Sequence, residues 1–416
     1  MKQLVIIGGG ASGLMAAIAA KETDGRLDVS LLEGRDRVGK KLLATGNGRC
    51  NLTNLGPLEG RYHGDWNWIR QVLEQFTVEQ TLSFFHSIGV SAVELEEGKA
   101  YPRSLQAASV LDALRYRAQE LGVQTICTRQ VTEIRRNGQG FSLLCKDGVS
   151  VPASAVIVCA GGKASASLSS DGAGYPLLSA LGHSVTPLFP AIVQLRTDTS
   201  LLRPLKGIKV TARVTARAGG DSRCETGEVL FTEYGLSGPP VLQVSRLFSA
   251  GQSGRILLDL IPDWTDQELL RELKQRRTAL SRRPLEQYLV GLLPKRLGET
   301  LLKAAGMVPL QRPVSAITER ETRALAGWIK RWELAVKGPH SWQSAQVTAG
   351  GVRTAEFDPS TLESSKVRGL FAAGEVLDVD GDCGGFNLQW AWSSGRVAGV
   401  SAARCLKTAD KPRMHR

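Results

Sequence analysis

The first part of the chain alternates short apolar runs with glycine-rich and helical segments. Residues Leu4–Ile7 are continuously apolar, which predicts a buried strand. An alanine-rich stretch after Gly13 predicts a helix, and the apolar run "DVSLLE", which ends at Glu33, predicts the next strand. Strand, helix and strand in this order predict a βαβ unit with two parallel strands in one sheet.

The middle of the chain changes its periodicity several times. Residues 65–90 and 108–122 have helical spacing, and the β-rich runs between 123 and 158 predict a meander that returns to the first sheet. A further helix is predicted from about Tyr175. From 191 to 262 apolar and polar positions alternate, which predicts the strands of a small barrel or sandwich, and from 263 to 335 the pattern is helical.

The last part of the chain is predicted to return to the first sheet. Residues 344–352 and the run "VRGLFAAGEVLD" predict two buried strands, and a helix is predicted to begin near Phe386 or Asn387. We therefore predict a discontinuous domain, 1–190 and 345–416. It is interrupted by a barrel-like domain, 191–262, and a helical subdomain, 263–344. The tail 407–416 is predicted to be disordered.

Composition is that of an ordinary globular protein. The 416 residues are 42% hydrophobic, enough for two or three domains with full cores. The seven cysteines form no C-x-x-C pair and the five histidines have no metal-ligand spacing, so we expect reduced thiols and no metal. Glycines interrupt the apolar N-terminus, which argues against a signal peptide, and no run of eighteen apolar residues occurs. We expect a cytoplasmic protein without a transmembrane segment.

The net charge of +12 is compatible with nucleic acid, an acidic membrane surface or anionic small molecules as partners. The densest basic run, 271–283, has leucines at helical spacing and no interleaved aromatic residues. We interpret it as a solvated helix face and expect no stable nucleic-acid partner. RNA retention that is sensitive to salt would contradict this interpretation. The sequence does not predict an oligomeric state.

A first candidate site lies in the predicted βαβ unit. Gly8, Gly10 and Gly13 are spaced as G-x-G-x-x-G between strand and helix, and Glu33 follows twenty residues later at the end of the second strand. This arrangement places a pyrophosphate on the helix N-terminus and a carboxylate on an adenosine ribose. An acid at Glu33 would repel a 2'-phosphate, so FAD or NAD fits this position better than NADP.

A second candidate site lies near the C-terminus, in "EVLDVDGDCGGFNLQWAWSSG" (375–395). Its acidic residues can accept hydrogen bonds from a polyol, and Gly384 and Gly385 allow close backbone approach at a helix start. The basic, glycine-rich segment after Glu33 places Lys40 and Lys41 where a pyrophosphate or adenine edge could be met. Gly161, in "CAGG", is expected to allow close approach to the dinucleotide, and no second G-x-G-x-x-G for NAD(P)H occurs.

Five motifs together carry a resemblance to a known family. They are "IIGGGASGLMAA", "GKKLLATGNGRCNLTN", "GEVLFTEYGLSGPPVLQVS", "QVTAGGV" and "FAAGEVLDVDGDCGGFNLQWAWSSGRVAG". The chain resembles the bacterial flavoproteins that include aminoacetone oxidase-like and bile-acid or steroid enone reductase-like members. More distantly, it is similar to fumarate reductase and ketosteroid dehydrogenase flavoproteins. The resemblance implies an α/β fold with one FAD per subunit, in which a glutathione-reductase-like FAD-binding Rossmann domain carries an inserted β-barrel and helical domain.

The resemblance also implies which residues contact FAD. Those expected at the adenosine half are Gly8, Gly10, Ser12, Gly13, Glu33, Lys41 and Val131. Those expected at the pyrophosphate and flavin are Gly46, Gly48, Arg49 and Asn51. Gly374, Glu375 and Asp378 are expected at the pyrophosphate and ribityl chain, and Gly385, Phe386 and Asn387 at the pyrimidine edge of the ring.

The predicted reaction is an NAD(P)H-driven reduction of an activated double bond in a steroid-like or other small substrate. Arg49, Tyr101, Arg103 and Tyr234 are candidate proton donors or oxyanion stabilisers, and the sequence does not choose among them. Two alternatives stay open. One is an oxidase of a small amine that releases hydrogen peroxide, and the other is a flavin-bearing RNA-modifying or nucleic-acid-binding protein.

Overall fold

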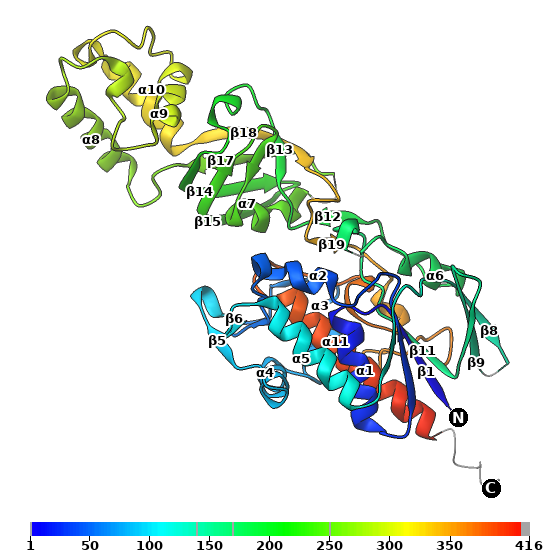
Figure 1. Ribbon diagram of the computed structural model, residues 1–416. Helices are drawn as coiled ribbons and strands as arrows, with labels where there is room; N and C mark the ends of the chain where they lie inside the picture. Colours follow the sequence, from blue (N-terminus) through cyan, green and yellow to red (C-terminus); the bar gives the residue numbers. More distant parts are fainter. Residues whose placement is uncertain (1, 139, 169, 249–250, 409–416) are drawn as a thin grey trace. The chain divides into compact units, whose positions relative to one another are not determined.

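The computed structural model describes residues 2–138, 140–168, 170–248 and 251–408. The chain divides into two compact units (Figure 1). The first unit comprises Met1–Phe189 and Gln346–Arg416, and the second comprises Pro190–Ala345. Each unit has its own cluster of buried apolar side chains.

The first unit is built on a parallel sheet with the strand order β20-β11-β1-β2-β7. Central strand β1 (Gln3–Ile7) pairs in parallel with β2 (Asp28–Leu32) and with β11 (Ala155–Val158). Strands β7 (Gln124–Ile126) and β20 (Leu370–Ala372) form the edges. The strands β1 and β11 are buried because a parallel sheet is covered on both faces, and the predicted βαβ unit is confirmed.

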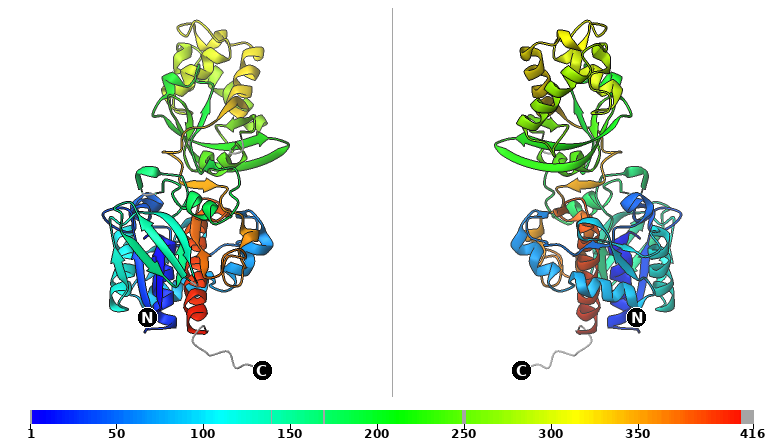
Figure 2. Two further views of the ribbon diagram at one scale, coloured as in Figure 1. Left: turned by 90° about the vertical axis from the view of Figure 1, so that its right-hand side faces the viewer. Right: turned by 90° about the vertical axis from the view of Figure 1, so that its left-hand side faces the viewer.

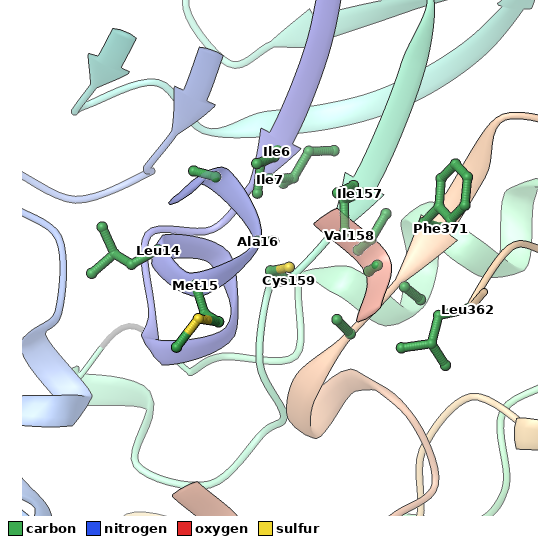
Figure 3. Packing of buried hydrophobic residues seen from close by; sticks show 14 of the residues in the cluster. Ile6, Ile7, Leu14, Met15, Ala16, Ile157, Val158, Cys159, Leu362 and Phe371 are labelled. Carbon is green, nitrogen blue, oxygen red and sulfur yellow. The ribbon is translucent and has the colours of Figure 1, made fainter. Parts of the chain in front are cut away.

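Helix α1 (Ala11–Thr23), near the N-terminus, and helix α11 (Phe386–Thr408), near the C-terminus, pack side by side (Figure 1, Figure 2). Gly395 and Gly399 are one turn apart on α11. A Cβ atom at these positions would lie 2.4 Å from the Ser12 carbonyl oxygen and 2.3 Å from that of Ala16. The helices therefore touch backbone to backbone. Figure 3 shows side chains from β1, α1 and β11 in the adjoining core, among them Ile6, Met15 and Ile157.

Shorter elements surround this core. The helices are α2 (Lys40–Ala44), α3 (Trp66–Leu73), α4 (Val78–Ser87), α5 (Ala107–Glu120) and α6 (Gly174–Ala180). The strands are β3 (Thr53–Asn54), β4 (Tyr62–His63), β5 (Ala92–Glu94), β6 (Lys99–Pro102), β12 (Phe189–Ala191), β19 (Val347–Ala349) and β21 (Asp380–Gly381). The helical prediction for 65–90 resolves into two helices because Asp65 and Thr77 each cap a helix start with a side-chain oxygen.

The prediction that residues 123–158 form a meander that returns to the first sheet is confirmed. Strands β7 and β11 belong to the parallel sheet. Between them, β8 (Val131–Asn137), β9 (Gly140–Cys145) and β10 (Ser150–Ala153) form a separate antiparallel sheet. These three strands are the predicted meander, and β11 is the strand that returns to the first sheet.

The second unit contains a closed six-stranded barrel in the order β13-β16-β15-β14-β17-β18. Its strands are β13 (Leu195–Thr197), β14 (Lys209–Ala218), β15 (Asp221–Phe231), β16 (Gly235–Ser237), β17 (Gly254–Asp259) and β18 (Trp332–Pro339). Its helices are α7 (Pro239–Val244), α8 (Asp266–Ala279), α9 (Lys295–Ala304) and α10 (Glu319–Lys330).

The assignment of 263–344 to a helical subdomain is wrong at its C-terminal end. Helix α10 ends at Lys330, and β18 then closes the barrel by pairing with both β17 and β13. The alternating burial of Trp332, Leu334 and Val336 is that of a strand with one face on the core. Because the helical pattern of α10 is followed almost directly by the alternating pattern of β18, the sequence does not show clearly where the helix ends and the strand begins.

Two further predictions concerned a disordered C-terminal tail and the absence of a transmembrane segment. Lys407 and Thr408, which were predicted to begin the disordered tail, form the last residues of α11, and 409–416 lie outside the described residues. None of the helices among the described residues is long and apolar enough to cross a membrane.

The α1–α11 contact predicts a position-specific effect of adding one methyl group. Gly399→Ala should lower the free energy of unfolding by about 1–3 kcal/mol, because the new Cβ overlaps the backbone of α1. In the matched control, Gly327→Ala in α10, the Cβ meets no described atom within 4 Å, and stability should rise by about 0.5–1 kcal/mol. Chemical denaturation of both variants tests this, and equal effects would contradict the close contact.

Candidate functional site

The three motif glycines at the start of α1 differ in their surroundings. Gly8 has φ +104°, and a Cβ there would lie 2.4 Å from the Cys159 carbonyl oxygen. A Cβ at Gly13 would lie 1.9 Å from the Gly8 carbonyl oxygen, whereas a Cβ at Gly10 would meet no described atom within 4 Å. Packing therefore explains Gly8 and Gly13. Only Gly10 faces open space, at the N-terminus of α1 where an anion would be stabilised.

Glu33 connects the end of β2 to the glycine loop. Its Oε2 accepts a hydrogen bond from the Gly9 N–H (2.9 Å), and its Oε1 accepts one from the Arg35 N–H (2.8 Å). The residue is buried, and its carbonyl oxygen accepts from the Arg129 N–H two residues before Val131. Because a carboxylate has about four acceptor sites, Glu33 can still accept hydrogen bonds from a bound ribose.

Lys41 and Glu375 lie far apart in the sequence but form an ion pair. Lys41 Nζ is 2.6 Å from Glu375 Oε2, and Glu375 Oε1 accepts a hydrogen bond from the Thr348 N–H (2.9 Å). Nearby, Gly161 has φ +72° and approaches Ser170. The sequence predicted separate cofactor contacts for both members of the pair, and their charges are paired with each other here.

The loop before α11 rests on the start of α1. The Gly374 N–H donates to Ser394 Oγ (2.9 Å), and its carbonyl oxygen accepts from Trp390 Nε1 (3.0 Å). A Cβ at Gly374 would lie 2.5 Å from Ser12 Oγ. Further along the loop, Asp378 Oδ2 accepts from Thr186 Oγ1 (3.1 Å). Trp390 thus has a hydrogen-bonding role in addition to its packing in the core.

Helix α11 begins at Phe386, as predicted. Asn387 holds the preceding loop, since its Oδ1 accepts from the Gly381 N–H (2.8 Å) and its Nδ2 donates to the Gly381 carbonyl (2.7 Å). The first helical hydrogen bond runs from the Gln389 N–H to the Gly385 carbonyl (2.9 Å). The N–H groups of 386–388 precede that bond and form the positive end of the helix dipole.

Asn51 lies beside this helix start. Its Oδ1 is buried without a hydrogen-bond partner in the described part of the chain. A Cβ atom added at Gly385 would lie 2.9 Å from this oxygen. A buried acceptor without a donor is costly, and such atoms often mark a ligand. The Asn51 acceptor and the open space at Gly10 both fit a dinucleotide with amide and phosphate groups.

The structure brings together two of the four candidate catalytic residues. The Arg49 guanidinium lies 5.0 Å from the ring centroid of Tyr101, a buried residue whose ring lies beside Gly46. Arg103 is exposed just after β6. Tyr234 belongs to the second unit. Gly48, with φ +83°, is exposed next to Arg49.

Sequence reasoning had noted the polar character of Asn54 but overlooked Thr53 and Gln389. Asn54 Nδ2 donates to the Gly384 carbonyl (2.8 Å), and Thr53 Oγ1 donates to Gln389 Oε1 (2.6 Å). Thr53 and Gln389 could have been recognised only as polar residues inside otherwise buried segments. Burial raises the pKa of the Cys50 thiol to about 12 and also raises that of Cys383, so both remain protonated.

A separate cluster has the residue types of a hydrolase triad. His183 Nδ1 is 2.8 Å from Glu356 Oε2, and His183 Nε2 is 2.9 Å from Ser364 Oγ. Although burial opposes ionisation, hydrogen bonds from Lys366, Ser184 and His183 lower the pKa of Glu356 to about 2. The His183 side chain is fully buried, and Ser364 Oγ accepts backbone N–H bonds from 366 and 367. The cluster is therefore a structural clamp. No group of His, Cys, Asp and Glu among the described residues could hold a metal ion.

With this geometry in place, the comparisons identify the family. The model of the HI0933-like protein Rossmann domain matches residues 2–401. The chain belongs to this family. The 3-dehydro-bile acid delta(4,6)-reductase of Clostridium scindens is 40% identical, over 97% of this chain and 99% of its own length. The ribosomal RNA dihydrouridine synthase of Escherichia coli is 31% identical, over 94% and 95%.

Two solved structures show weaker similarity. A flavocytochrome c3 fumarate reductase has a TM-score of 0.48 at 18% identity and is matched over 97% of this chain and 78% of its own. The 3-ketosteroid-delta4-(5alpha)-dehydrogenase of Rhodococcus jostii has a TM-score of 0.46 at 16% identity, with 97% of both chains matched. Neither similarity bears on the reaction of this chain. Family membership confirms the predicted Rossmann-type FAD-binding fold and the class of FAD-dependent oxidoreductase.

The different surroundings of the glycines predict different effects of the same substitution. Gly10→Val should leave the fold stable and weaken FAD binding at least about tenfold, because the new side chain occupies open space at the helix start. Gly13→Val should instead lower the free energy of unfolding, because it collides with the Gly8 backbone. Flavin absorbance per chain and chemical denaturation separate these effects. Full flavin content in Gly10→Val would contradict the assignment.

Proposed function

We propose that this chain is an FAD-dependent reductase of a carbon–carbon double bond conjugated to a carbonyl group, with NADH or NADPH as a transient electron donor. The main support is the 40% identity to a bile-acid enone reductase over nearly the full length of both chains. A 3-dehydro-bile acid with a Δ4 bond is such a conjugated ketone. Uridine, from which the dihydrouridine made by the Escherichia coli relative is formed, also has a double bond conjugated to a ring carbonyl.

The residues of the first unit have distinct proposed roles in holding FAD. The Gly8–Gly13 loop and Glu33 hold the adenosine half, with Ser12, Lys41 and Val131 close by, and Gly161, Gly374, Glu375 and Asp378 border the centre of the dinucleotide. Asn51 and the start of α11 meet the ring, so the partial positive charge of the helix stabilises its electron-rich edge. FAD, when bound, supplies hydride transfer.

Arg49 and Tyr101 are the strongest candidates to assist the substrate. The Tyr101 hydroxyl can donate a proton to the carbon next to the carbonyl, and Arg49 can stabilise negative charge on the carbonyl oxygen. A hydride and a proton thus add across the double bond, and one NAD(P)H is oxidised. Arg103 and Tyr234 lack this pairing but remain candidates for substrate contact.

Ribosomal RNA is a second candidate substrate, and the charge distribution favours it. The segment Pro190–Ala345 contains 24 Lys and Arg and 15 Asp and Glu, so it carries +9 of the net charge of +12. The expectation of no stable nucleic-acid partner considered only the run 271–283 and did not consider this concentration of charge. Phosphate-rich ligands are attracted to such a surface. No comparable observation favours the amine oxidase.

Anaerobic spectroscopy of the purified protein tests the proposed reaction. NADH or NADPH should bleach the flavin absorbance, and a 3-oxo-Δ4 steroid should restore it as the double bond is reduced. Gly10→Val protein provides the flavin-poor control. A flavin that stays oxidised with both donors would contradict the proposal, and peroxide release from small amines would then support the oxidase.

A further inference from the structure

Strand β6 presents three long side chains on one face. In its antiparallel pairing with β5, Tyr101 lies opposite Val93 (Figure 1). The Arg103 N–H donates to the Ser91 carbonyl (2.8 Å), so the pairing continues one residue beyond β6. Because alternate residues of a strand point to the same side of a sheet, Lys99, Tyr101 and Arg103 share one face.

This face lies beside the two loops that are proposed to hold the flavin. A Cβ atom added at Gly46 would lie 3.2 Å from Tyr101 Cε1, and one added at Gly384 would lie 3.7 Å from Lys99 Cε. Asn54, which is paired with Lys99 across β3 and β6, donates to the Gly384 carbonyl (2.8 Å). All of these residues belong to the first unit, so the face and the proposed flavin site are parts of one compact unit.

Three cations surround the buried Tyr101 ring on this face. Arg49 lies over the ring, and Lys99 forms an ion pair with Glu97 (2.5 Å). Arg49 and Arg103 are exposed, and neither has a carboxylate within ion-pair distance in the described part of the chain. We call Lys99, Arg103 and Arg49 the β6 cationic face. Its two guanidinium groups without a carboxylate partner attract an anionic ligand.

The phosphate groups of a nicotinamide nucleotide fit the β6 cationic face. The one G-x-G-x-x-G segment of the sequence is assigned to FAD, which leaves no second segment of this type for an NAD(P)H donor. The nicotinamide ring has to reach the flavin, so the pyrophosphate of the donor must be held by side chains beside the flavin. Guanidinium groups bind phosphate oxygens through two parallel N–H bonds. A 3-oxo-Δ4 steroid has no charge at its reacting end and does not require these cations.

We propose that Lys99 and Arg103 bind the phosphate groups of NADH or NADPH, with Arg49 completing the site. The inference rests on the proposed reductase function and assigns a binding site to its electron donor. At this site the C4–H bond of the nicotinamide breaks, and the hydrogen passes with two electrons to FAD. NAD(P)H is thereby oxidised to NAD(P)+ and leaves, and the substrate with the double bond then takes its place.

The test follows reduction of the FAD-loaded protein under anaerobic conditions. Stopped-flow absorbance gives the rate of flavin bleaching over a range of NADH and NADPH concentrations. Arg103→Gln should raise the nucleotide concentration for half-maximal rate about tenfold or more, because a charge-assisted hydrogen bond to phosphate is lost. Lys99→Met should act in the same direction. The dissociation constants of NAD+ and NADP+ from the oxidised protein, measured by calorimetry, should rise by a similar factor.

Arg404→Gln is the matched control. Arg404 is exposed, has no carboxylate partner among the described residues, and lies in α11 about 27 Å along the helix from Phe386. Its half-maximal nucleotide concentration should equal that of the wild type. Arg103→Lys keeps the charge but loses the paired N–H groups, so its value should lie between those of the wild type and Arg103→Gln.

A second measurement separates this inference from the proposed function. Dithionite reduces the flavin without a nucleotide, and reoxidation by a 3-oxo-Δ4 steroid then tests double-bond reduction alone. If the steroid reoxidises this protein but neither nucleotide bleaches the flavin, the donor site is overturned while double-bond reduction stands. If the nucleotides bleach the flavin and the variants respond as expected but the steroid does not reoxidise it, the donor site stands and the proposed double-bond reduction fails.

The variants themselves can also overturn the donor site. Flavin content and far-UV circular dichroism identify a variant that fails to fold, and the exposed Arg103 then decides the test if Lys99→Met is lost. Equal half-maximal nucleotide concentrations in folded Arg103→Gln and Arg404→Gln would overturn the inference. An effect of Arg103→Gln on steroid reoxidation alone would assign the cation to the substrate and would overturn it as well.

Discussion

The first unit depends on the backbone contact between α1 and α11. Gly395 and Gly399 allow the last helix to approach the carbonyl oxygens of Ser12 and Ala16. This approach brings the glycine loop after β1 together with the loop before Phe386, although almost the whole chain separates them. Gly374 then lies on Ser12, and its two backbone groups are bonded to Ser394 and Trp390 of α11. Close packing of two helices thus assembles the proposed cofactor site of this split domain.

Unsatisfied polar atoms suggest ligand sites in both units. In the first unit, Asn51 Oδ1 has no donor within the described part of the chain, and we propose that an edge of the flavin supplies one. In the second unit, Gln194 Oε1 and His340 Nδ1 have no hydrogen-bond partner among the described residues, on two residues that lie opposite each other beside β13 and β18. The His183 cluster shows the contrasting case, because its ring nitrogens, its glutamate and its serine are all bonded. We therefore interpret buried polar atoms without a hydrogen-bond partner as signs of a ligand site, and the fully hydrogen-bonded His183 cluster as structural.

The reaction class and the substrate depend on different features. Family membership and the two glycine loops support flavin chemistry, and they would serve any substrate with a conjugated double bond. We propose that substrate choice depends on the inserted unit, which carries most of the net charge and the stacked Tyr234–His340 pair. Enzymes of one fold often diverge in this way, because a shared cofactor domain constrains chemistry while an inserted domain can change its polar groups freely.

The sequence by itself determined the βαβ unit, the start of α11 and the family, because these depend on local periodicity and on glycines at fixed spacing. It also predicted that the Glu33 carboxylate lies at the end of the second strand of this unit. Only the tertiary structure decided that β18 closes the barrel, that Lys41 pairs with Glu375, and that Arg49 lies on Tyr101 while Arg103 is exposed. It also revealed Gln194 and His340, which are 146 positions apart in the printed numbering. Contacts between distant segments leave no local sequence pattern, because they arise when helices and strands pack together, and local periodicity does not show which elements will pack against each other.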